Sequence, residues 1–202
     1  MLEKLRPGIS AKDARVVLFD FDGTLSLIRT GWMDVMVPMM VEVLLELKTG
    51  ESEEQLRQVV TEFVSRLTGK QTIYQMITLA DEVRKRGGQP LDPLEYKKRY
   101  LQLLWEKIKD RVHELERGDA PPEKYLVPGA REFLEALKER GLTMYLASGT
   151  DQEDARREAQ LLDISKYFDG GVYGALDDYK RFSKALLIQQ IISSMSCRGE
   201  QI

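Results

Sequence analysis

The stretch RVVLFDFDGTLS, residues 15–26, passes from an apolar run directly into two carboxylates. Val16 to Phe19 is continuously apolar and contains two β-branched residues, which is typical of a strand buried on both faces. Asp20 and Asp22 follow at its end, and Gly23 allows the backbone to turn sharply. Because parallel sheets bind ligands beyond the carboxyl ends of their strands, we expect both carboxylates to face a ligand. The alternative is that Asp-Gly only marks a turn.

Composition narrows the class of protein. Hydrophobic residues make up 43% of the 202 residues and charged residues 31%, as in ordinary globular domains. The net charge of −3 argues against nucleic acid or an anionic membrane as a partner. Cys197 has no second cysteine to pair with, and residues 1–15 lack the apolar core of a signal peptide. The most apolar stretch, residues 32–47, is too short and too polar to span a bilayer. We expect a cytoplasmic protein whose oligomeric state the sequence leaves open.

A long helical region follows the first strand, from about Trp32 to Val112. Ser52-Glu-Glu-Gln55 has the pattern of a capping box that opens one helix. Apolar residues at three- and four-residue spacing predict a second helix over 72–86 and a third over 93 to about 112. These segments predict an all-helical unit.

After the Pro-rich break at 117–125, short helices and strands alternate. We expect helices over 128–141, 150–162 and 183–195, and strands over 142–147 and 171–173, with Thr150-Asp-Gln-Glu153 capping the middle helix. This alternation predicts a parallel sheet joined by right-handed crossovers. The predicted fold is α/β: a Rossmann-like core of residues 1–27 and 121–202, interrupted by a helical cap domain of residues 28–120.

The two carboxylates suit phosphoryl-transfer chemistry. Asp20 and Asp22 offer the oxygen ligands that Mg²⁺ prefers, and an aspartate can also act as a nucleophile or as an acid and base. Ser148-Gly149-Thr150 ends a second strand at the start of a helix, where a hydroxyl and free N–H groups can cradle an anion. The alternative is an ordinary helix cap at Thr150. Two complementary sites at one sheet edge favour phosphoryl transfer.

A cation is expected to balance the carboxylates and the phosphate oxygens. Lys184 opens the last predicted helix, and its position can direct it toward the sheet edge. Lys180 is the competing candidate. We favour Lys184.

These motifs resemble those of the haloacid dehalogenase superfamily of phosphohydrolases. Asp20 to Thr24 is similar to the first motif, Ser148 to the second and Lys184 to the third, and the insert resembles a C1-type cap. The resemblance implies that Asp20 attacks phosphorus while Asp22 acts as acid and then base. It further implies that Asp20 and the Asp22 carbonyl hold Mg²⁺. The residues implied to contact the phosphate are Thr24, Ser148, Gly149 and Lys184.

The fourth motif of that family, an acidic pair after one further strand, has no match before residue 202. Asp177 and Asp178 precede the last helix, so their order is wrong for that role. We expect either that the sequence is part of a longer protein, which we favour, or that it binds metal poorly and is catalytically weak.

The cap offers candidates for substrate contact in Arg29, Lys70, Gln71 and Tyr74. A solvated or helix-capping role is the favoured interpretation for each. Met33, Met36, Met39 and Met40 could line an adaptable apolar wall, but packing between cap helices is favoured. His113 is assigned no catalytic role.

The sequence therefore predicts a Mg²⁺-dependent phosphatase that hydrolyses a small phosphorylated metabolite through an aspartyl-phosphate. One alternative is a catalytically silent or weak module that binds phosphate or a partner, and another is a phosphomutase. A phosphoacceptor signalling domain is disfavoured by the helical insert directly after the first strand. The sequence does not identify the substrate.

Overall fold

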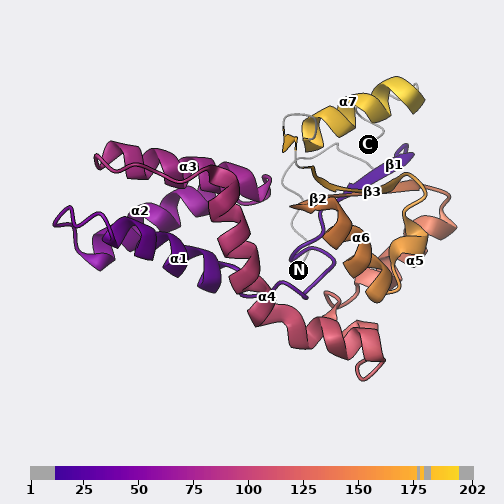
Figure 1. Cartoon of the computed structure of the whole chain (residues 1–202). Helices are drawn as coiled ribbons and strands as arrows, with labels where there is room; N and C mark the ends of the chain where they lie inside the picture. The colour runs from indigo at the N-terminus through magenta and orange to yellow at the C-terminus, as the bar shows by residue number, and fades with distance from the viewer. Residues whose placement is uncertain (1–11, 177, 180–182, 196–202) are drawn as a thin grey trace.

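A computed structural model describes residues 12–176, 178–179 and 183–195 of the chain. Its sheet has three parallel strands in the order β1-β2-β3. The strands are β1 (Val16–Phe19), β2 (Thr143–Asp151) and β3 (Gly171–Ala175). A helical bundle inserted after β1 lies to one side of the sheet (Figure 1). The predicted α/β class, with a helical insert in a parallel-sheet core, is confirmed.

The insert holds four helices, and three more accompany the sheet. The helices of the insert are α1 (Met33–Leu45), α2 (Glu53–Arg66), α3 (Thr72–Lys85) and α4 (Pro93–Arg117). Those of the core are α5 (Ala130–Glu139), α6 (Gln152–Leu161) and α7 (Lys184–Met195), with 3₁₀ turns η1 (Pro122–Tyr125) and η2 (Ser165–Tyr167). Among the described residues, none of the helices combines the length and apolar character needed to cross a bilayer.

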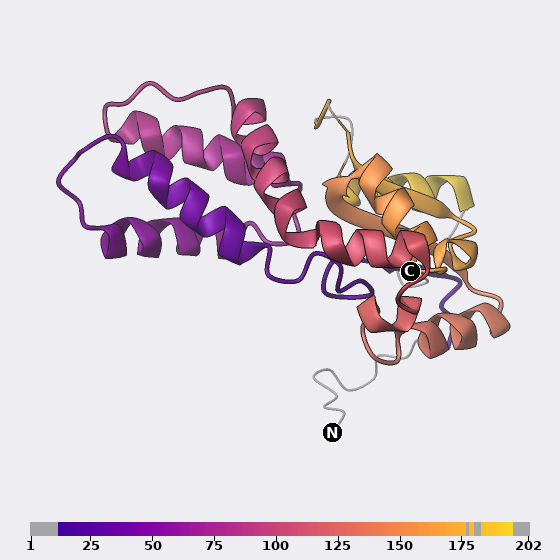
Figure 2. The ribbon, with the colours of Figure 1, turned by 60° about the horizontal axis from the view of Figure 1, so that its bottom comes forward.

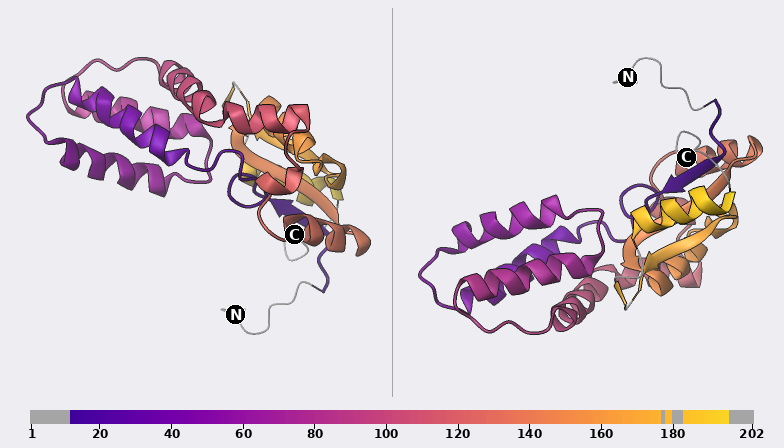
Figure 3. Two further views of the ribbon diagram at one scale, coloured as in Figure 1. Left: turned by 90° about the horizontal axis from the view of Figure 1, so that it is seen from below. Right: turned by 90° about the horizontal axis from the view of Figure 1, so that it is seen from above.

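The sheet is covered on both faces, which explains why β1 is apolar throughout. Val16 packs with Ala147, Leu187 and Ile191 beneath α7. On the opposite face, the ring of Phe19 meets the rings of Phe133 and Phe168 edge-on, at 6.0 and 6.1 Å. Views from below and above show the helices on either side of the strands (Figure 3). Burial on both faces leaves the strand ends as the place for polar side chains.

The register between β1 and β2 fixes what lies at that edge. Phe19 is paired with Leu146, so the residues that follow on each strand emerge side by side. Those residues are Asp20, directly after β1, and Ala147-Ser148 in β2. The two predicted motifs are thus brought to one edge by strand pairing.

Local signals placed most helix ends well. The predicted capping box is present: Ser52 Oγ accepts from the Gln55 N–H, and the Gln55 side chain accepts from the Ser52 N–H. The predicted end of α4 near Val112 is wrong, because the buried stripe continues through Leu115. The helix ends instead at Gly118, whose φ of 71° closes it in the left-handed conformation.

The second motif differs from the prediction. β2 runs on to Asp151, which pairs with Ala175 after an irregularity in the ladder. The expected cap by Thr150 is wrong: Asp151 is the N-cap residue of α6, and no side chain caps that end. Thr150 remains extended because its side chain contacts Asp22 instead.

Two chain segments connect the insert to the sheet, and they lie side by side. The Leu27 N–H donates to the Tyr125 carbonyl at 2.8 Å, and the Val127 N–H donates to the Leu25 carbonyl at 2.9 Å. α4 leaves the bundle and runs toward the sheet region (Figure 2). This arrangement holds the insert over the carboxyl ends of the strands.

Candidate functional site

Asp20 meets a cation at the strand edge. Lys184, at the start of α7, places Nζ 2.7 Å from Asp20 Oδ1. The same oxygen accepts the Phe21 N–H at 2.9 Å. Lys180 lies outside the described residues, as does Asp177. The structure brings Lys184 to Asp20, and the choice between the two lysines stays a prediction.

Asp22 is held by two hydroxyl groups from β2. Ser148 Oγ and Thr150 Oγ1 donate to Asp22 Oδ2 at 3.0 and 2.9 Å, across 126 and 128 residues of sequence. Ser148 Oγ also accepts the Thr150 N–H at 3.0 Å, and Ser148 is fully buried. The hydroxyl predicted to contact phosphate therefore orients Asp22, and its role toward phosphate stays a prediction.

A tight turn carries the chain away from Asp22. Gly23 adopts a φ of 76°, a left-handed conformation that favours glycine, and its N–H donates to the Ser26 carbonyl at 2.9 Å. Thr24 is exposed in this turn and does not line the pocket that contains Asp20 and Asp22. The structure thus does not bring Thr24 to the other predicted site residues.

Gly149 lies close against the backbone of the insert. A Cβ on this residue would lie 2.4 Å from the backbone carbonyl oxygen of Lys70 in the α2–α3 loop. Any larger residue would have to push the two backbones apart. Glycine at the second motif therefore lets the helical insert close over the strand ends.

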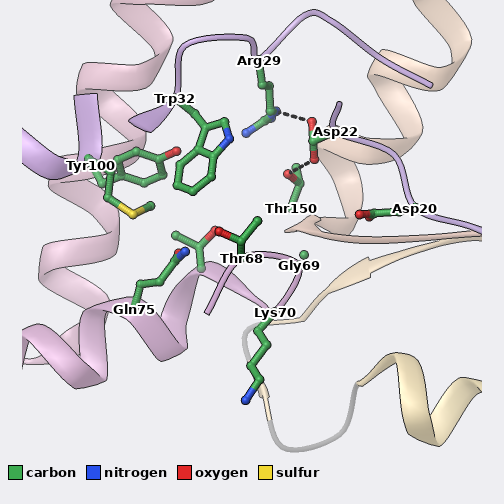
Figure 4. A pocket seen from close by; sticks show the side chains of 13 residues that line it. Asp20, Asp22, Arg29, Trp32, Thr68, Gly69, Lys70, Gln75, Tyr100 and Thr150 are labelled. Atoms are coloured by element: carbon green, nitrogen blue, oxygen red, sulfur yellow. Dashed lines mark hydrogen bonds and ion pairs between the residues drawn. The ribbon is translucent and has the colours of Figure 1, made fainter. Parts of the chain in front are cut away.

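The pocket between these parts has a volume of about 100 Å³ (Figure 4). The strand edge supplies Asp20, Asp22, Gly149 and Thr150, and the connecting segment supplies Arg29. The residues from the insert are Trp32, Met36, Thr68, Gly69, Lys70, Thr72, Gln75 and Tyr100. This pocket is small, and two unlike surfaces enclose it.

Arg29 is buried in an ion-pair network, so the expectation that it is solvated is wrong. Its Nη2 lies 2.7 Å from Glu158 Oε1 and 2.9 Å from Asp154 Oδ2, and its Nε lies 4.0 Å from Asp22 Oδ1. Burial disfavours the charge, but the carboxylate of Glu158 raises the pKa of Arg29. Burial raises the pKa of Glu158, and the guanidinium opposes that shift. The network links α6 to Asp22.

The other cap candidates connect the insert to the core. Gln71 Nε2 donates to the Tyr179 carbonyl at 3.0 Å, and the rings of Tyr74 and Tyr179 meet edge-on at 5.8 Å. In Figure 4 the Lys70 side chain extends away from Trp32 and Tyr100. Lys70 also lines a neighbouring cavity of about 450 Å³ together with Lys184. These residues lie at the boundary of the site.

The residues of the pocket that the sequence analysis did not single out include Trp32, Gln75 and Tyr100. Gln75 carried a usable signal, because it lies one helical turn before buried Leu79, in a position where an apolar residue is expected. Tyr100 lies similarly one turn before buried Leu104. A polar side chain in line with the buried apolar residues of a helix is therefore a sequence signal that could have identified Gln75 and Tyr100 as site residues.

The favoured packing role is confirmed for two of the four methionines, and the prediction that His113 has no catalytic role stays a prediction. Met39 and Met40 are buried in the packing of the insert, and Met36 also lines the pocket. The His113 ring meets the Trp105 ring edge-on at 5.7 Å. Within the described part of the chain, His, Cys, Asp and Glu form no group of three or more that could hold a metal. Asp20 and Asp22 are the two carboxylates that any cation in this pocket would meet.

Comparison with known proteins gives the family. A family model for haloacid dehalogenase-like hydrolases matches residues 14–196. A curated relative, the phosphorylated carbohydrates phosphatase of Thermotoga maritima, is 38% identical over 69 residues. That segment is 34% of this chain and 32% of the relative, so the match spans about a third of the relative's length.

Two solved structures share the fold. A predicted phosphoglycolate phosphatase from Haemophilus somnus is 15% identical with a TM-score of 0.57, covering 94% of this chain and 75% of its own. A haloacid dehalogenase-like family protein from Streptococcus pneumoniae is 19% identical with a TM-score of 0.50, covering 91% and 71%. At these identities the likeness concerns the fold alone. The family model, which spans nearly the whole described chain, shows that this protein belongs to the haloacid dehalogenase-like hydrolases.

Proposed function

We propose that this chain is a Mg²⁺-dependent phosphatase that hydrolyses a small phosphate monoester through an aspartyl-phosphate on Asp20. The observation that carries the proposal is the meeting of Asp20, Asp22, Lys184 and the β2 hydroxyls at one strand edge. The name of the Thermotoga maritima relative, a phosphatase of phosphorylated carbohydrates, supports the same class of reaction.

In the first half-reaction, an oxygen of Asp20 forms a bond to phosphorus while the bond from phosphorus to the alcohol oxygen breaks. Asp22 in its protonated form gives its proton to that oxygen, so the alcohol leaves neutral. The ammonium of Lys184, which contacts Asp20 at 2.7 Å, lies where it can balance negative charge on the carboxylate and the phosphoryl oxygens.

In the second half-reaction, water attacks phosphorus and gives its proton to Asp22 as the aspartyl–phosphorus bond breaks. Inorganic phosphate leaves, and both carboxyl groups return to their starting states. Ser148 and Thr150 orient Asp22 through its Oδ2, which keeps the acid and base in position. The insert over the pocket limits the access of other water.

Mg²⁺ fits the chemistry of this edge, where two carboxylates end a strand and, among the described residues, Oδ1 of Asp22 is buried without a hydrogen-bond partner. The Asp20 carboxylate and the Asp22 main-chain carbonyl would hold the ion. When bound, it would neutralise charge on the phosphoryl oxygens.

The test is phosphate release from p-nitrophenyl phosphate by the full chain, with and without EDTA. We expect turnover that needs Mg²⁺ and that Asp20→Asn abolishes. Turnover that survives in Asp20→Asn would overturn the proposal. Phosphate binding with no turnover, with or without Mg²⁺, would favour the silent binding module instead.

A further inference from the structure

The surface that the insert presents to the pocket is mostly polar and uncharged. Trp32, Gln75 and Tyr100 lie on this side (Figure 4), and Met36, Thr68 and Thr72 also line the pocket. Burial raises the pKa of the Tyr100 hydroxyl, so this group stays protonated and neutral. Apart from Lys70, the residues of the insert that line the pocket carry no charge.

Three neutral polar groups on this surface have hydrogen-bonding capacity that the described residues do not use. Gln75 is only 4% exposed, and its amide has no partner among those residues. Among the described residues, the hydroxyl of Tyr100, also 4% exposed, and the indole N–H of the half-buried Trp32 likewise have no hydrogen-bond partner. All three residues line the pocket, so a ligand bound there can supply the partners. Alcohol hydroxyl groups both donate and accept, and they suit all three.

The cations near the pocket are already engaged or directed elsewhere. Arg29 is shared by Asp22, Asp154 and Glu158. Lys184 contacts Asp20 on the core side. Lys70 extends away from Trp32 and Tyr100 in Figure 4, toward the cavity it shares with Lys184. An anionic group beside Trp32 would therefore meet the carboxylate of Asp22, while the unshared cation of the pocket, Lys70, points away from that place.

We propose, on the basis of the phosphatase function above, that the alcohol part of the substrate is small, uncharged and hydroxylated. Its C–H face lies against the Trp32 ring, and its hydroxyls bond to Gln75 and Tyr100. Esters whose alcohol carries a carboxylate or a second phosphate are poor substrates. Selection occurs by charge on the insert side, while the core side binds the phosphoryl group.

A matched pair of substrates tests this directly. Glycerol 1-phosphate and 3-phosphoglycerate have the same carbon chain and differ by a carboxylate in place of a hydroxymethyl group. We expect kcat/KM to favour glycerol 1-phosphate at least about tenfold, which is the ratio that 1.4 kcal/mol gives. Equal rates, or preference for 3-phosphoglycerate, would overturn this inference and leave the phosphatase proposal standing. Release from neither ester nor from p-nitrophenyl phosphate would overturn both.

Two variants compare a positive charge added in the pocket with the same charge added elsewhere on the insert. Thr68→Lys adds a cation at an exposed position that lines the pocket, and we expect it to shift the ratio toward 3-phosphoglycerate about tenfold. Thr61→Lys adds the same charge on exposed α2 outside the pocket and should change the ratio less than about twofold. Equal shifts in the two variants would contradict selection at this surface.

Gln75→Leu removes the amide at nearly constant volume. Because the amide has no partner among the described residues, we expect thermal stability to be unchanged or raised. The KM for glycerol 1-phosphate should rise about tenfold, a change that the Thr61→Lys control should not show. A loss of stability with an unchanged KM would assign Gln75 a structural role and contradict the inference.

Discussion

The two sides of the pocket differ in the kind of group they present. The core side, at the ends of β1 and β2, presents Asp20 and Asp22 with the cation of Lys184 beside them. The insert side presents Trp32, Gln75 and Tyr100, which are neutral. Strand pairing fixes the charged groups, whereas helices carry the neutral ones. Under the proposed function, the reaction belongs to the core side and recognition of the alcohol to the insert side, so each can be perturbed alone.

The largest expected effect concerns Arg29, which lies between the two sides. Arg29→Met leaves Glu158 buried without its partner, and breaking a buried pair costs about 3–5 kcal/mol. Urea unfolding should show a loss of that size. The double variant Arg29→Met with Glu158→Met should recover most of it, because no buried charge remains on that pair. A single-variant loss below about 1 kcal/mol would contradict a structural role for the pair that joins the connecting segment to α6.

A smaller effect is expected on the core side. Lys184→Met removes the ammonium that contacts Asp20, and losing one such group typically lowers kcat about 10²–10³-fold, or about 2.7–4 kcal/mol. The measurement is phosphate release from p-nitrophenyl phosphate. Lys166→Met, which changes an exposed lysine paired with Asp163, is the matched control and should retain activity. Equal activity of the two variants would remove Lys184 from the site.

The strand edge could be predicted from the sequence because its signals are local. An apolar run that ends in Asp20 and Asp22, and a second that ends at Ser148, are enough to place both motifs once parallel pairing is assumed. The start of α2 at Ser52 was predictable for the same reason. Lys184 could be preferred over Lys180 from its place at a helix start.

What could not be predicted depends on contacts between distant residues. Arg29 looked solvated because its partner Glu158 is 129 residues away. Thr150 looked like a helix cap, since its neighbours fit that pattern, but its hydroxyl contacts Asp22 across 128 residues. The close approach of Lys70 to Gly149 likewise joins two units that sequence patterns treat separately. Only the folded chain brings these pairs together.

Thr150 offers a finer test of the core side. Thr150→Val removes one of the two hydroxyls on Asp22 at nearly constant volume, and hydrogen bonds to charged groups contribute about 1.5–3 kcal/mol. We expect kcat to fall about tenfold or more with KM little changed. Thr78→Val, which removes a hydroxyl that bonds to the Tyr74 carbonyl in the insert, is the control and should keep kcat. A kcat unaffected in both variants would contradict the orienting role.

The smallest expected effect concerns the ion pairs that Arg86 makes with Glu51 and Glu82 in the insert. Hydrogen bonds from Arg86 lower the pKa of Glu51. Burial opposes the ionisation of Glu82, but hydrogen bonds from Lys85 and Arg86 outweigh it and lower the pKa of Glu82. Because the pKa of each carboxyl is lower in the folded chain than its ordinary value of 4.5, ionisation of Glu51 and Glu82 stabilises the fold at any pH above 4.5. This stability is lost as the pH falls through the pKa values of the folded chain.

Arg86→Gln should therefore flatten the acid side of the curve of melting temperature against pH, with kcat at neutral pH unchanged. The measurement is thermal unfolding across the acid range, beside activity at neutral pH. A variant that loses activity without losing acid dependence would show that the insert and the core are not separable in this way.

The most direct test of the account is to find where the phosphoryl group goes. Turnover of p-nitrophenyl phosphate by the full chain is quenched with acid, and tryptic peptides are analysed by mass spectrometry. The account predicts one phosphoryl group on Asp20 within the peptide of residues 16–29, absent from Asp20→Asn. Full turnover with the phosphoryl group on another residue, or with none trapped at any quench time, would contradict it.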